Sequence, residues 1–564
     1  MGALWLLIFS NSTSEPITKL FIDKFMTTST RGPSYSEIVT KSTTDIHKNA
    51  SIQTQARNIL GKHKYIKYKR QHFMHGYHRL AINDSSLDAA QPFSNNTTNL
   101  MCNGEIYNYS SLVTDYSISG LTSNSDVEVL LPLYNSQGIT TVLNQLRGEY
   151  SFVITQNLEG YSIDNIHIYA ACDFIGTKSL YLTYNTDINL YLVCTELKNI
   201  PRHLLTNPKY ITKQIPSGYY YDWNTSKTDF INYFNFNTYS NLNNLTHNSS
   251  TPTGIELVYS QITNTFKTSI IEKFTFGDLG YSSILLSGGF DSSLISVVVL
   301  EYLYENNLLN LLDNIYFLTV SDCPASDDVI HAKELVTFLE VKYNVTLTHK
   351  IIYISHATTI ANKIQDIIYT TETANTDSII NSIFYYFLYT YLKTQELSIS
   401  SLLTGDGLDE YFTENTDPQI FQDSSISALQ NLYSKTLPKT DKLAGKFSIE
   451  ARYPYLDYNV FNLLLNVTPN LRKSVYFSTN QLPIDKYIVR KSFQNYLPES
   501  ILWRPQQEIT NCPINIKSRL INHYDSIYTT SQVSDYNNIY DTVTNSLDLH
   551  LHKTFCELFD ASLS

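Results

Sequence analysis

The chain has 564 residues, with 40 Lys and Arg against 52 Asp and Glu, so its formal net charge is −12. One hydrophobic core seldom organises so long a chain, and we therefore expect two domains. Because like charges do not cluster in blocks, the pattern argues against a nucleic-acid partner, and any phosphate site must be local. The six scattered cysteines show no zinc spacing, which predicts reduced thiols, a cytoplasmic location, no disulfide and no structural metal.

The chain begins with MGALWLLIFS, an apolar run that an export signal, a membrane anchor or a buried strand could explain. No basic residue precedes the apolar stretch, and it is far shorter than the ~20 residues that cross a bilayer. Leu6 also stands where a myristoylation signal requires Ser or Thr. We therefore predict a buried first strand, and no membrane-spanning segment elsewhere.

The rest of the chain predicts two domains with different sheets. Up to residue 222, short strand-like runs such as SFVITQ and LYLVCTE predict a sheet-rich domain over residues 1–222. Residues 223–253 are polar and Asn-rich, which predicts a linker or a long surface loop. Over residues 254–564, strand-like runs alternate with long helical patterns, as in a parallel α/β sheet.

The strongest chemical signal is SSILLSGGFDSSLISVVVLEYL, in which an apolar strand runs into Ser287–Ser293 and then a helix. Glycines let the backbone approach a phosphate, and the amides and dipole of a helix N-terminus favour its charge. Asp291 adds a carboxylate suited to Mg²⁺. The alternative is an ordinary glycine turn, but the heptapeptide resembles the PP-loop of ATP pyrophosphatases, which implies adenylation of a substrate.

A second segment, SLLTGDGLDEYF, places Asp406, Asp409 and Glu410 around two glycines where a strand-like run ends. Such carboxylates can hold Mg²⁺ on a leaving pyrophosphate. Alone, the segment would be a solvated acidic turn. Paired with the PP-loop it resembles the asparagine synthetase family, which has Ser-Gly-Glu-Gly-Ser-Asp-Glu at this place.

The resemblance extends over nearly the whole chain. In the first half the family's segments follow in order at Arg31-Gly32-Pro33, His78-Arg79-Leu80-Ala81-Ile82, Gln91-Pro92, Asn103-Gly104-Glu105-Ile106-Tyr107-Asn108, Ser125-Asp126-Val127-Glu128 and Pro216-Ser217-Gly218. In the second half they follow at Glu372-Thr373, Glu450-Ala451-Arg452-Tyr453-Pro454-Tyr455-Leu456-Asp457, Asp485-Lys486-Tyr487-Ile488-Val489-Arg490 and Trp503-Arg504-Pro505.

The resemblance implies a fold and an activity for the first domain. It implies an α/β and α+β protein whose N-terminal domain is an αββα Ntn-type sandwich, a class II glutamine amidotransferase. In the family a cysteine after the methionine attacks the glutamine amide, its free amine relays protons, and an Asn-Gly pair receives the oxyanion.

The nucleophile of that domain is absent here, because Gly2 stands in its place. By resemblance Arg79 would bind the glutamine carboxylate, Asn103 and Gly104 would form the oxyanion hole, and Glu105 and Asp126 would hold the α-amino group, with Leu80, Ala81, Ile82 and Asn83 completing the glutamine-binding set. Cys102 is expected to be a small buried apolar residue and no substitute nucleophile. Arg79 and Asp126 are expected to let glutamine bind without being hydrolysed.

The second domain resembles the family's synthetase domain, a parallel α/β PP-loop domain of the adenine nucleotide alpha hydrolase type. There ATP and Mg²⁺ convert aspartate to β-aspartyl-AMP and pyrophosphate, and ammonia displaces AMP to give asparagine. The resemblance implies ATP binding by Leu285, Ser287, Gly288, Gly289, Asp291, Ser292, Ser293, Thr319, Thr404 and Gly405, magnesium binding by Asp291 and Asp409, and catalytic roles for Asp406 and Lys486. By position alone, Lys486 would be a solvated helix lysine.

Some positions depart from the family pattern. Asp406 replaces a Glu. An Arg of the family is replaced by Ile380 and another by Cys172, and a Lys-Glu pair is replaced by Gln506-Gln507. These replacements remove cations that the family has, and cations are what would bind the carboxylates of a substrate such as aspartate.

Three hypotheses therefore stand. The first is an asparagine synthetase, supplied with nitrogen by glutamine or only by ammonia. The second is a related adenylating ligase of the β-lactam synthetase type, whose members lack the terminal cysteine but use a Tyr where Asp406 keeps the acid. The third is a non-catalytic binding homologue. All three predict small-molecule partners, no nucleic acid and no membrane, and leave a homodimer open.

Overall fold

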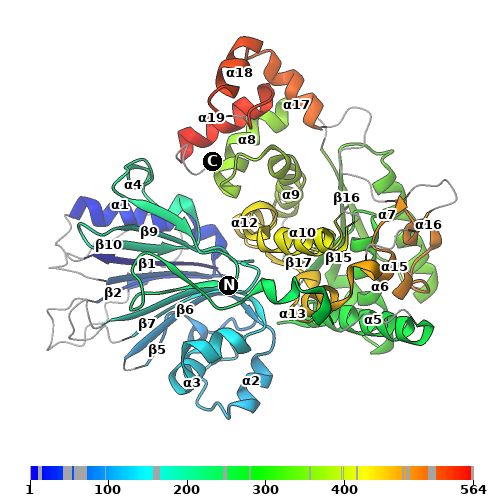
Figure 1. Ribbon diagram of the computed structural model, residues 1–564, viewed down its shortest axis with the longest axis horizontal. Helices are drawn as coiled ribbons and strands as arrows, with labels where there is room; N and C mark the ends of the chain where they lie inside the picture. The colour runs from blue at the N-terminus through cyan, green and yellow to red at the C-terminus, as the bar shows by residue number, and fades with distance from the viewer. Residues whose placement is uncertain are drawn as a thin grey trace.

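The computed structural model describes residues 2–9, 15–41, 54–55, 73–95, 97–156, 166–245, 251–277, 281–354, 357–395, 397, 399–413, 417–472, 476–477, 483–505, 516–540 and 542–559. Figure 1 shows two domains side by side, with a group of C-terminal helices above them. None of the helices in these ranges is long and apolar enough to cross a membrane.

The first domain contains two antiparallel sheets. The seven-stranded sheet has the order β11-β9-β10-β1-β4-β2-β3. Its strands are β1 (Gly2–Phe9), β2 (Tyr35–Lys41), β3 (Thr54–Gln55), β4 (Phe73–Arg79), β9 (Tyr181–Asn185), β10 (Leu190–Cys194) and β11 (Ile211–Gln214). The six-stranded sheet has the order β13-β12-β8-β7-β6-β5. Its strands are β5 (Phe93–Ser94), β6 (Thr98–Ile106), β7 (Gly148–Gln156), β8 (His167–Cys172), β12 (Tyr219–Asp222) and β13 (Phe230–Asn232).

Strand β1 shows why the opening run is apolar throughout. Leu4, Leu6 and Ile8 face the second sheet, whereas Trp5 and Leu7 belong to the core cluster that contains helix α1 (Glu15–Met26). A strand buried on both faces reads as a continuous apolar run. On the outer face of the second sheet, helices α2 (Tyr109–Asp115) and α3 (Leu130–Gln145) close a third core. The layers are thus helix, sheet, sheet and helix, which confirms the predicted sandwich (Figure 1).

The second domain is built on a parallel sheet with the order β16-β15-β14-β17-β18. Its strands are β14 (Tyr281–Leu285), β15 (Ile315–Ser321), β16 (Thr348–Tyr353), β17 (Ile399–Leu403) and β18 (Glu450–Arg452), and every pairing is parallel. Its longer helices are α5 (Pro252–Thr275), α6 (Phe290–Glu305), α7 (Asp327–Tyr343), α8 (Ala357–Thr371), α9 (Thr376–Thr394), α10 (Pro418–Gln430), α12 (Leu437–Lys446), α13 (Tyr458–Asn466), α17 (Ile516–Asp525), α18 (Thr530–Asn537) and α19 (Ser546–Leu558). The predicted α/β domain is confirmed.

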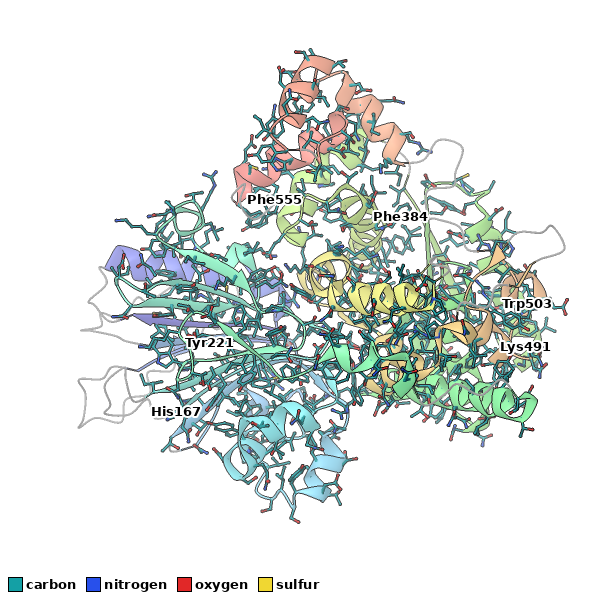
Figure 2. All side chains as sticks on the ribbon, in the orientation of Figure 1. His167, Tyr221, Phe384, Lys491, Trp503 and Phe555 are labelled. Atoms are coloured by element: carbon teal, nitrogen blue, oxygen red, sulfur yellow. The ribbon has the colours of Figure 1, made fainter. Side chains whose placement is uncertain are left out.

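Aromatic side chains contribute to both domains. Figure 2 places Tyr221 in the first domain and Phe384 and Phe555 among the helices of the second, and all three side chains are buried. The predicted boundary at residue 222 stays a prediction, although β13 extends the second sheet beyond it by pairing with β12.

Candidate active site

Two loops meet at the carboxyl edge of the parallel sheet. The first follows β14 and the second follows β17, and these two strands are direct neighbours. A Cβ placed on Gly405 would lie 3.2 Å from the Cβ of Asp291. The glycine therefore lets the acidic loop contact the PP-loop, as expected for a ligand site at this edge of an open α/β sheet.

The PP-loop has a shape that requires glycine. Gly288 has a φ of +78°, and a Cβ there would lie 2.4 Å from the carbonyl oxygen of Asp328. Ser292 Oγ accepts a hydrogen bond from Ser287 N at 3.0 Å, which ties the loop to the first turn of α6. No side chain caps that turn at Gly289. Its first amides are available to an anion.

Lys486 joins the two loops. Its side chain is buried, and its Nζ donates to Asp291 Oδ2 at 2.7 Å and pairs with Asp409. Its backbone has a φ of +55°, an uncommon conformation for a residue other than glycine. Burial alone would lower the pKa of Lys486, but the charges of Asp291, Asp409 and Asp485 outweigh it and raise the pKa. Lys486 is therefore a fixed cation between the two loops, and its catalytic role stays a prediction.

Asp291 and Asp409 suit a magnesium ion. Burial raises the pKa of Asp291 to about 6, although the charge of Lys486 opposes the shift. Among the described residues Asp291 Oδ1 is buried without a hydrogen-bond partner. Mg²⁺ is usually held by one or two carboxylates together with substrate phosphates, so this donor set fits the ion. Bound there, the ion would neutralise charge on the phosphates of ATP.

Asp406 has partners that its sequence position did not reveal. Its Oδ2 accepts from Tyr385 Oη at 2.8 Å and from Thr440 Oγ1 at 2.9 Å, and Lys439 Nζ lies 3.8 Å from Oδ1. Tyr385 is buried on α9 and also lies 3.3 Å from Thr404 Oγ1. Only tertiary structure could find this tyrosine, because α9 has no motif that marks it.

The remaining predicted ATP residues lie around the PP-loop and differ in whether their side chains already form hydrogen bonds. Leu285 ends β14, and Ser293 Oγ is buried without a hydrogen-bond partner in the described ranges. Thr319 Oγ1 donates to the carbonyl of Leu286 at 2.6 Å, so this side chain supports the base of the loop. Arg504 adds a cation that sequence reasoning gave no role: it donates to the carbonyl of Gly288 at 3.0 Å.

The predicted glutamine residues also come together. Arg79, Leu80, Ala81, Ile82, Asn83, Gly104, Glu105 and Asp126 line one pocket in the first domain. Asn103 lies beside it, and its Oδ1 accepts from Gly2 N at 2.9 Å. The space left open is only about 20 Å³, enough for about one water molecule.

The groups expected to hold glutamine are engaged by the protein itself. Glu105 forms a bidentate ion pair with Arg452 of the second domain, at 2.7 and 2.8 Å. Asp126 accepts from Asn83 Nδ2 at 2.6 Å and from Ile106 N at 2.7 Å.

The Arg79 guanidinium donates to the backbone carbonyls of Asp84 and Ser86. Binding glutamine in this pocket would therefore require these contacts of Arg79, Glu105 and Asp126 to be exchanged.

The first position of the strand has no room for a side chain. A Cβ on Gly2 would lie 1.5 Å from the carbonyl oxygen of His78 on the neighbouring strand. Cys102 packs in the core shared with α2 and α3 and does not line the glutamine pocket. Burial raises the pKa of its thiol, so it is a poor nucleophile.

Two departures from the family pattern lie in apolar surroundings. Ile380 is buried in α9 and Cys172 is buried at the end of β8. Neither therefore supplies a cation to a substrate. Gln506 and Gln507 lie outside the described residues.

A buried ion network joins the two domains. Lys178 Nζ donates to Asp441 Oδ1 and Glu450 Oε1, each at 2.5 Å. Arg31 pairs with Asp441 at 2.9 Å and with Glu196 at 2.7 Å. Burial alone would raise the pKa of Asp441, but the charges of Arg31 and Lys178 lower it to about 2.

Replacing Lys178 by Met should destabilise the protein by about 3–5 kcal/mol, because two buried carboxylates lose their cation. Chemical denaturation monitored by circular dichroism measures the loss. Lys213→Met removes an exposed pair with Asp229 and should leave the stability nearly unchanged, because exposed ion pairs contribute little. Equal losses in the two variants would show that the buried network does not stabilise the domain boundary.

Comparison with known proteins agrees with this geometry. The profile of the glutamine amidotransferase domain matches residues 36–246, and that of asparagine synthase matches residues 281–415 and 413–552. A probable glutamine-hydrolysing asparagine synthetase of Acanthamoeba polyphaga mimivirus is 32% identical, covering 80% of this chain and 78% of the relative. The asparagine synthetase of Gallus gallus is 27% identical, covering 78% and 77%. That of Escherichia coli, asparagine synthetase B, is 24% identical, covering 77% and 74%.

Among solved structures, a glutamine phosphoribosylpyrophosphate amidotransferase of B. subtilis aligns with a TM-score of 0.31 and 13% identity over 78% of this chain and 95% of its own, too low a similarity to carry an argument. The family profiles and the relative at 32% identity confirm the resemblance seen in the motifs. The chain belongs to the asparagine synthetase family, whose members are ligases that form carbon–nitrogen bonds.

Proposed function

We propose that this protein makes asparagine from aspartate, ATP and ammonia, through β-aspartyl-AMP, with release of AMP and pyrophosphate. The observation that carries the proposal is the buried Lys486 between Asp291 and Asp409, where the PP-loop meets the acidic loop. A fixed cation and two carboxylates suited to magnesium are what the transfer of an adenylyl group requires. The curated relatives named above support aspartate as the acceptor.

The residues of the site have separate roles in phosphate binding, charge stabilisation and proton transfer. The amides at the start of α6 and the hydroxyls of Ser287 and Ser292 bind phosphate oxygens. Lys486 stabilises the charge that develops as the aspartate carboxylate attacks the α-phosphorus. Asp406 is held by Tyr385 and Thr440, and its proposed role is to accept the proton that ammonia loses when the amide forms.

Ammonia is the proposed nitrogen source, because Gly2 offers no nucleophile. The first domain then acts as a packed partner of the synthetase domain, joined to it by the Glu105–Arg452 pair.

The proposal is tested by incubating the protein with ATP, magnesium, aspartate and an ammonium salt. AMP, pyrophosphate and asparagine should appear in equal amounts. ADP and phosphate would contradict the assignment of the PP-loop. Asp291→Ala should abolish the activity by removing a magnesium ligand, whereas Asp423→Ala, an exposed carboxylate on α10, should leave it unchanged.

A second candidate is an adenylating ligase of the β-lactam synthetase type, whose members use a Tyr where Asp406 stands. The hydroxyl of Tyr385 donates to Asp406 and so brings a tyrosine to the same place, which favours this candidate. Such an enzyme closes an amide onto an amine of its own substrate and needs no ammonium. Dependence of AMP release on ammonium, with aspartate as the acceptor, separates the two functions.

A further inference from the structure

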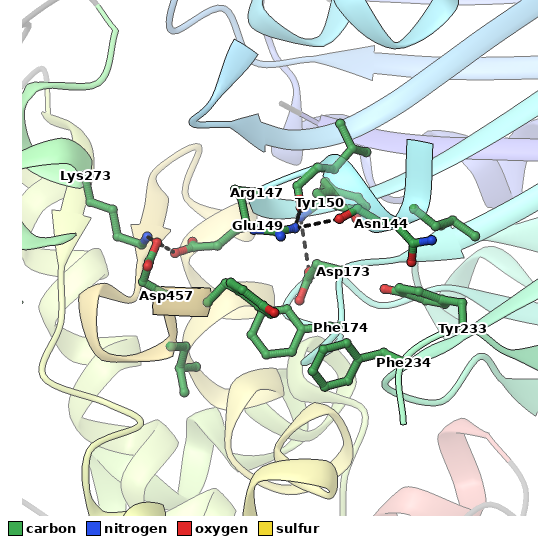
Figure 3. A pocket seen from close by; sticks show the side chains of 15 residues that line it. Asn144, Arg147, Glu149, Tyr150, Asp173, Phe174, Tyr233, Phe234, Lys273 and Asp457 are labelled. Atoms are coloured by element: carbon green, nitrogen blue, oxygen red, sulfur yellow. Dashed lines mark hydrogen bonds and ion pairs between the residues drawn. The ribbon is translucent and has the colours of Figure 1, made fainter. Parts of the chain in front are cut away.

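A second pocket lies at the boundary of the two domains (Figure 3). Its volume is about 110 Å³, room for several water molecules. The first domain contributes Arg147, Glu149 and Phe174 to its wall, and the second contributes Lys273 and Tyr458. The exposed Asn144 also lines it, so the pocket reaches from the surface to buried charges.

Glu149 is the unusual group in this wall. Its Oε1 accepts from Tyr453 N at 3.0 Å and lies 4.0 Å from Lys273 Nζ. Its Oε2 is buried and, among the described residues, has no hydrogen-bond partner. A buried carboxylate oxygen without a donor is costly unless a ligand supplies one.

The pocket suits a small cation with several N–H donors. Phe174, Phe234 and Tyr458 present aromatic surface to it, and Arg147 already stacks on Tyr458 at 4.0 Å from the ring centre. Lys273 is neutralised by Asp457, with Nζ 3.1 Å from Oδ2. Asp173 also lines the pocket, but both of its oxygens accept hydrogen bonds, from Tyr150 N, Ile175 N and Gly176 N among others. Among the described carboxylates of the lining, Glu149 is therefore the one with an oxygen that lacks a donor.

The surroundings of Glu149 also set its affinity for a proton. Burial raises its pKa to about 8, the nearby charge of Glu450 adds to the shift, and Lys273 and Lys178 oppose it. The hydroxyl of Tyr107 also interacts with it electrostatically. A carboxylate with so high a pKa can take a proton from an ammonium ion far more readily than an ordinary one.

The pocket is in contact with the synthetase loops. Leu456 lines it, and a Cβ on Gly407 of the acidic loop would lie 2.4 Å from Leu456 Cδ2. The neighbouring Tyr455 donates its hydroxyl to the carbonyl of Asp291 at 2.6 Å. One layer of side chains thus separates the pocket from the loops that would hold the acyl-adenylate.

We propose that this pocket admits ammonium ions from solution and that Glu149 deprotonates them for the amide-forming step. The ammonium ion gives one proton to the Glu149 carboxylate, which leaves neutral ammonia and a carboxylic acid. The ammonia nitrogen then forms the C–N bond with the acyl carbon as the bond between that carbon and AMP breaks, and the proton that the nitrogen loses goes to Asp406. The Glu149 proton returns to water at the rim. This inference rests on the proposed function.

The test is Glu149→Gln, assayed with two nucleophiles. Ammonium-dependent asparagine formation should fall about 100-fold, because general-base catalysis is lost. Hydroxylamine, which is largely neutral near pH 7, needs no such base, so formation of aspartyl hydroxamate should stay within about twofold. Glu128→Gln, a buried glutamate that only binds its own loop, is the matched control and should change neither rate.

Aspartate-dependent exchange of pyrophosphate into ATP, which needs no nitrogen source, separates this inference from the proposed function. Loss of exchange in the unmodified protein would contradict the function itself. Two results for a Glu149→Gln variant with intact exchange would overturn the role of Glu149. One is an equal fall of the rates with ammonium and with hydroxylamine, and the other is an unchanged rate with ammonium. Glu149→Asp, which keeps the acid but retracts it, should show the same selectivity with a smaller loss and applies if the Gln variant does not fold.

Discussion

Replacing Lys486 by Met should lower aspartate-dependent pyrophosphate release by about 10²–10³-fold. The side chain is buried, its charge is fixed by Asp291 and Asp409, and no other described cation pairs with both carboxylates. Removing one preorganised electrostatic contact from a transferring phosphoryl centre has effects of this size. The measurement is the initial rate of pyrophosphate release at saturating ATP and aspartate.

The matched control is Lys491→Met on the same short helix, α15 (Tyr487–Ser492), where the lysine contacts only Gln494 among the partners seen. Its rate should stay within about twofold of the unmodified protein. Circular dichroism must show that both variants are folded. A folded Lys486→Met variant with an unchanged rate would remove Lys486 from the site.

The sequence predicts the local parts of this protein well because their signals are local. The continuous apolar run of β1 follows from its burial on both faces, and the two glycine-containing loops can be read from their residues. Their meeting follows from the rule that ligands bind at the carboxyl edge of a parallel sheet. The contact between Gly405 and Asp291 and the partners of Asp406 had to come from the structure.

Contacts across the domain boundary could not be predicted in this way. Glu105 reads as a glutamine ligand in its motif, yet its carboxylate is paired with Arg452, 347 residues away. Tyr385 and Glu149 stand in no recognisable pattern, and their roles depend on which chain segments pack against them. Long-range pairs of this kind are set by tertiary packing. The sequence therefore predicts which residues form the glutamine site, but not that other groups of the protein already bind them.

Asparagine formation should follow the concentration of ammonium, and added glutamine should give neither asparagine nor glutamate above background. Without a thiol at position 2 the nucleophile that forms the acyl-enzyme is missing. The residues expected to bind glutamine already have protein partners, Asn83 for Asp126 and Arg452 for Glu105. Amino-acid analysis measures the asparagine formed with each nitrogen source. The rate with ammonium should exceed the rate with glutamine by more than about 100-fold. The N-terminus of the sample is verified by mass spectrometry.

Restoring the nucleophile should not restore the activity. In Gly2→Cys, even with Met1 removed to free the amine, the Cβ would lie 1.5 Å from the carbonyl oxygen of His78, so β1 must move away from β4. That movement also breaks the bond from Gly2 N to Asn103, the predicted oxyanion donor. Gly2→Ala isolates the steric effect and should cost about 1–3 kcal/mol of stability, the range for overpacking a core. An alanine variant as stable as the original, or glutamate production by the cysteine variant, would show that the strand yields readily and that only the thiol is missing.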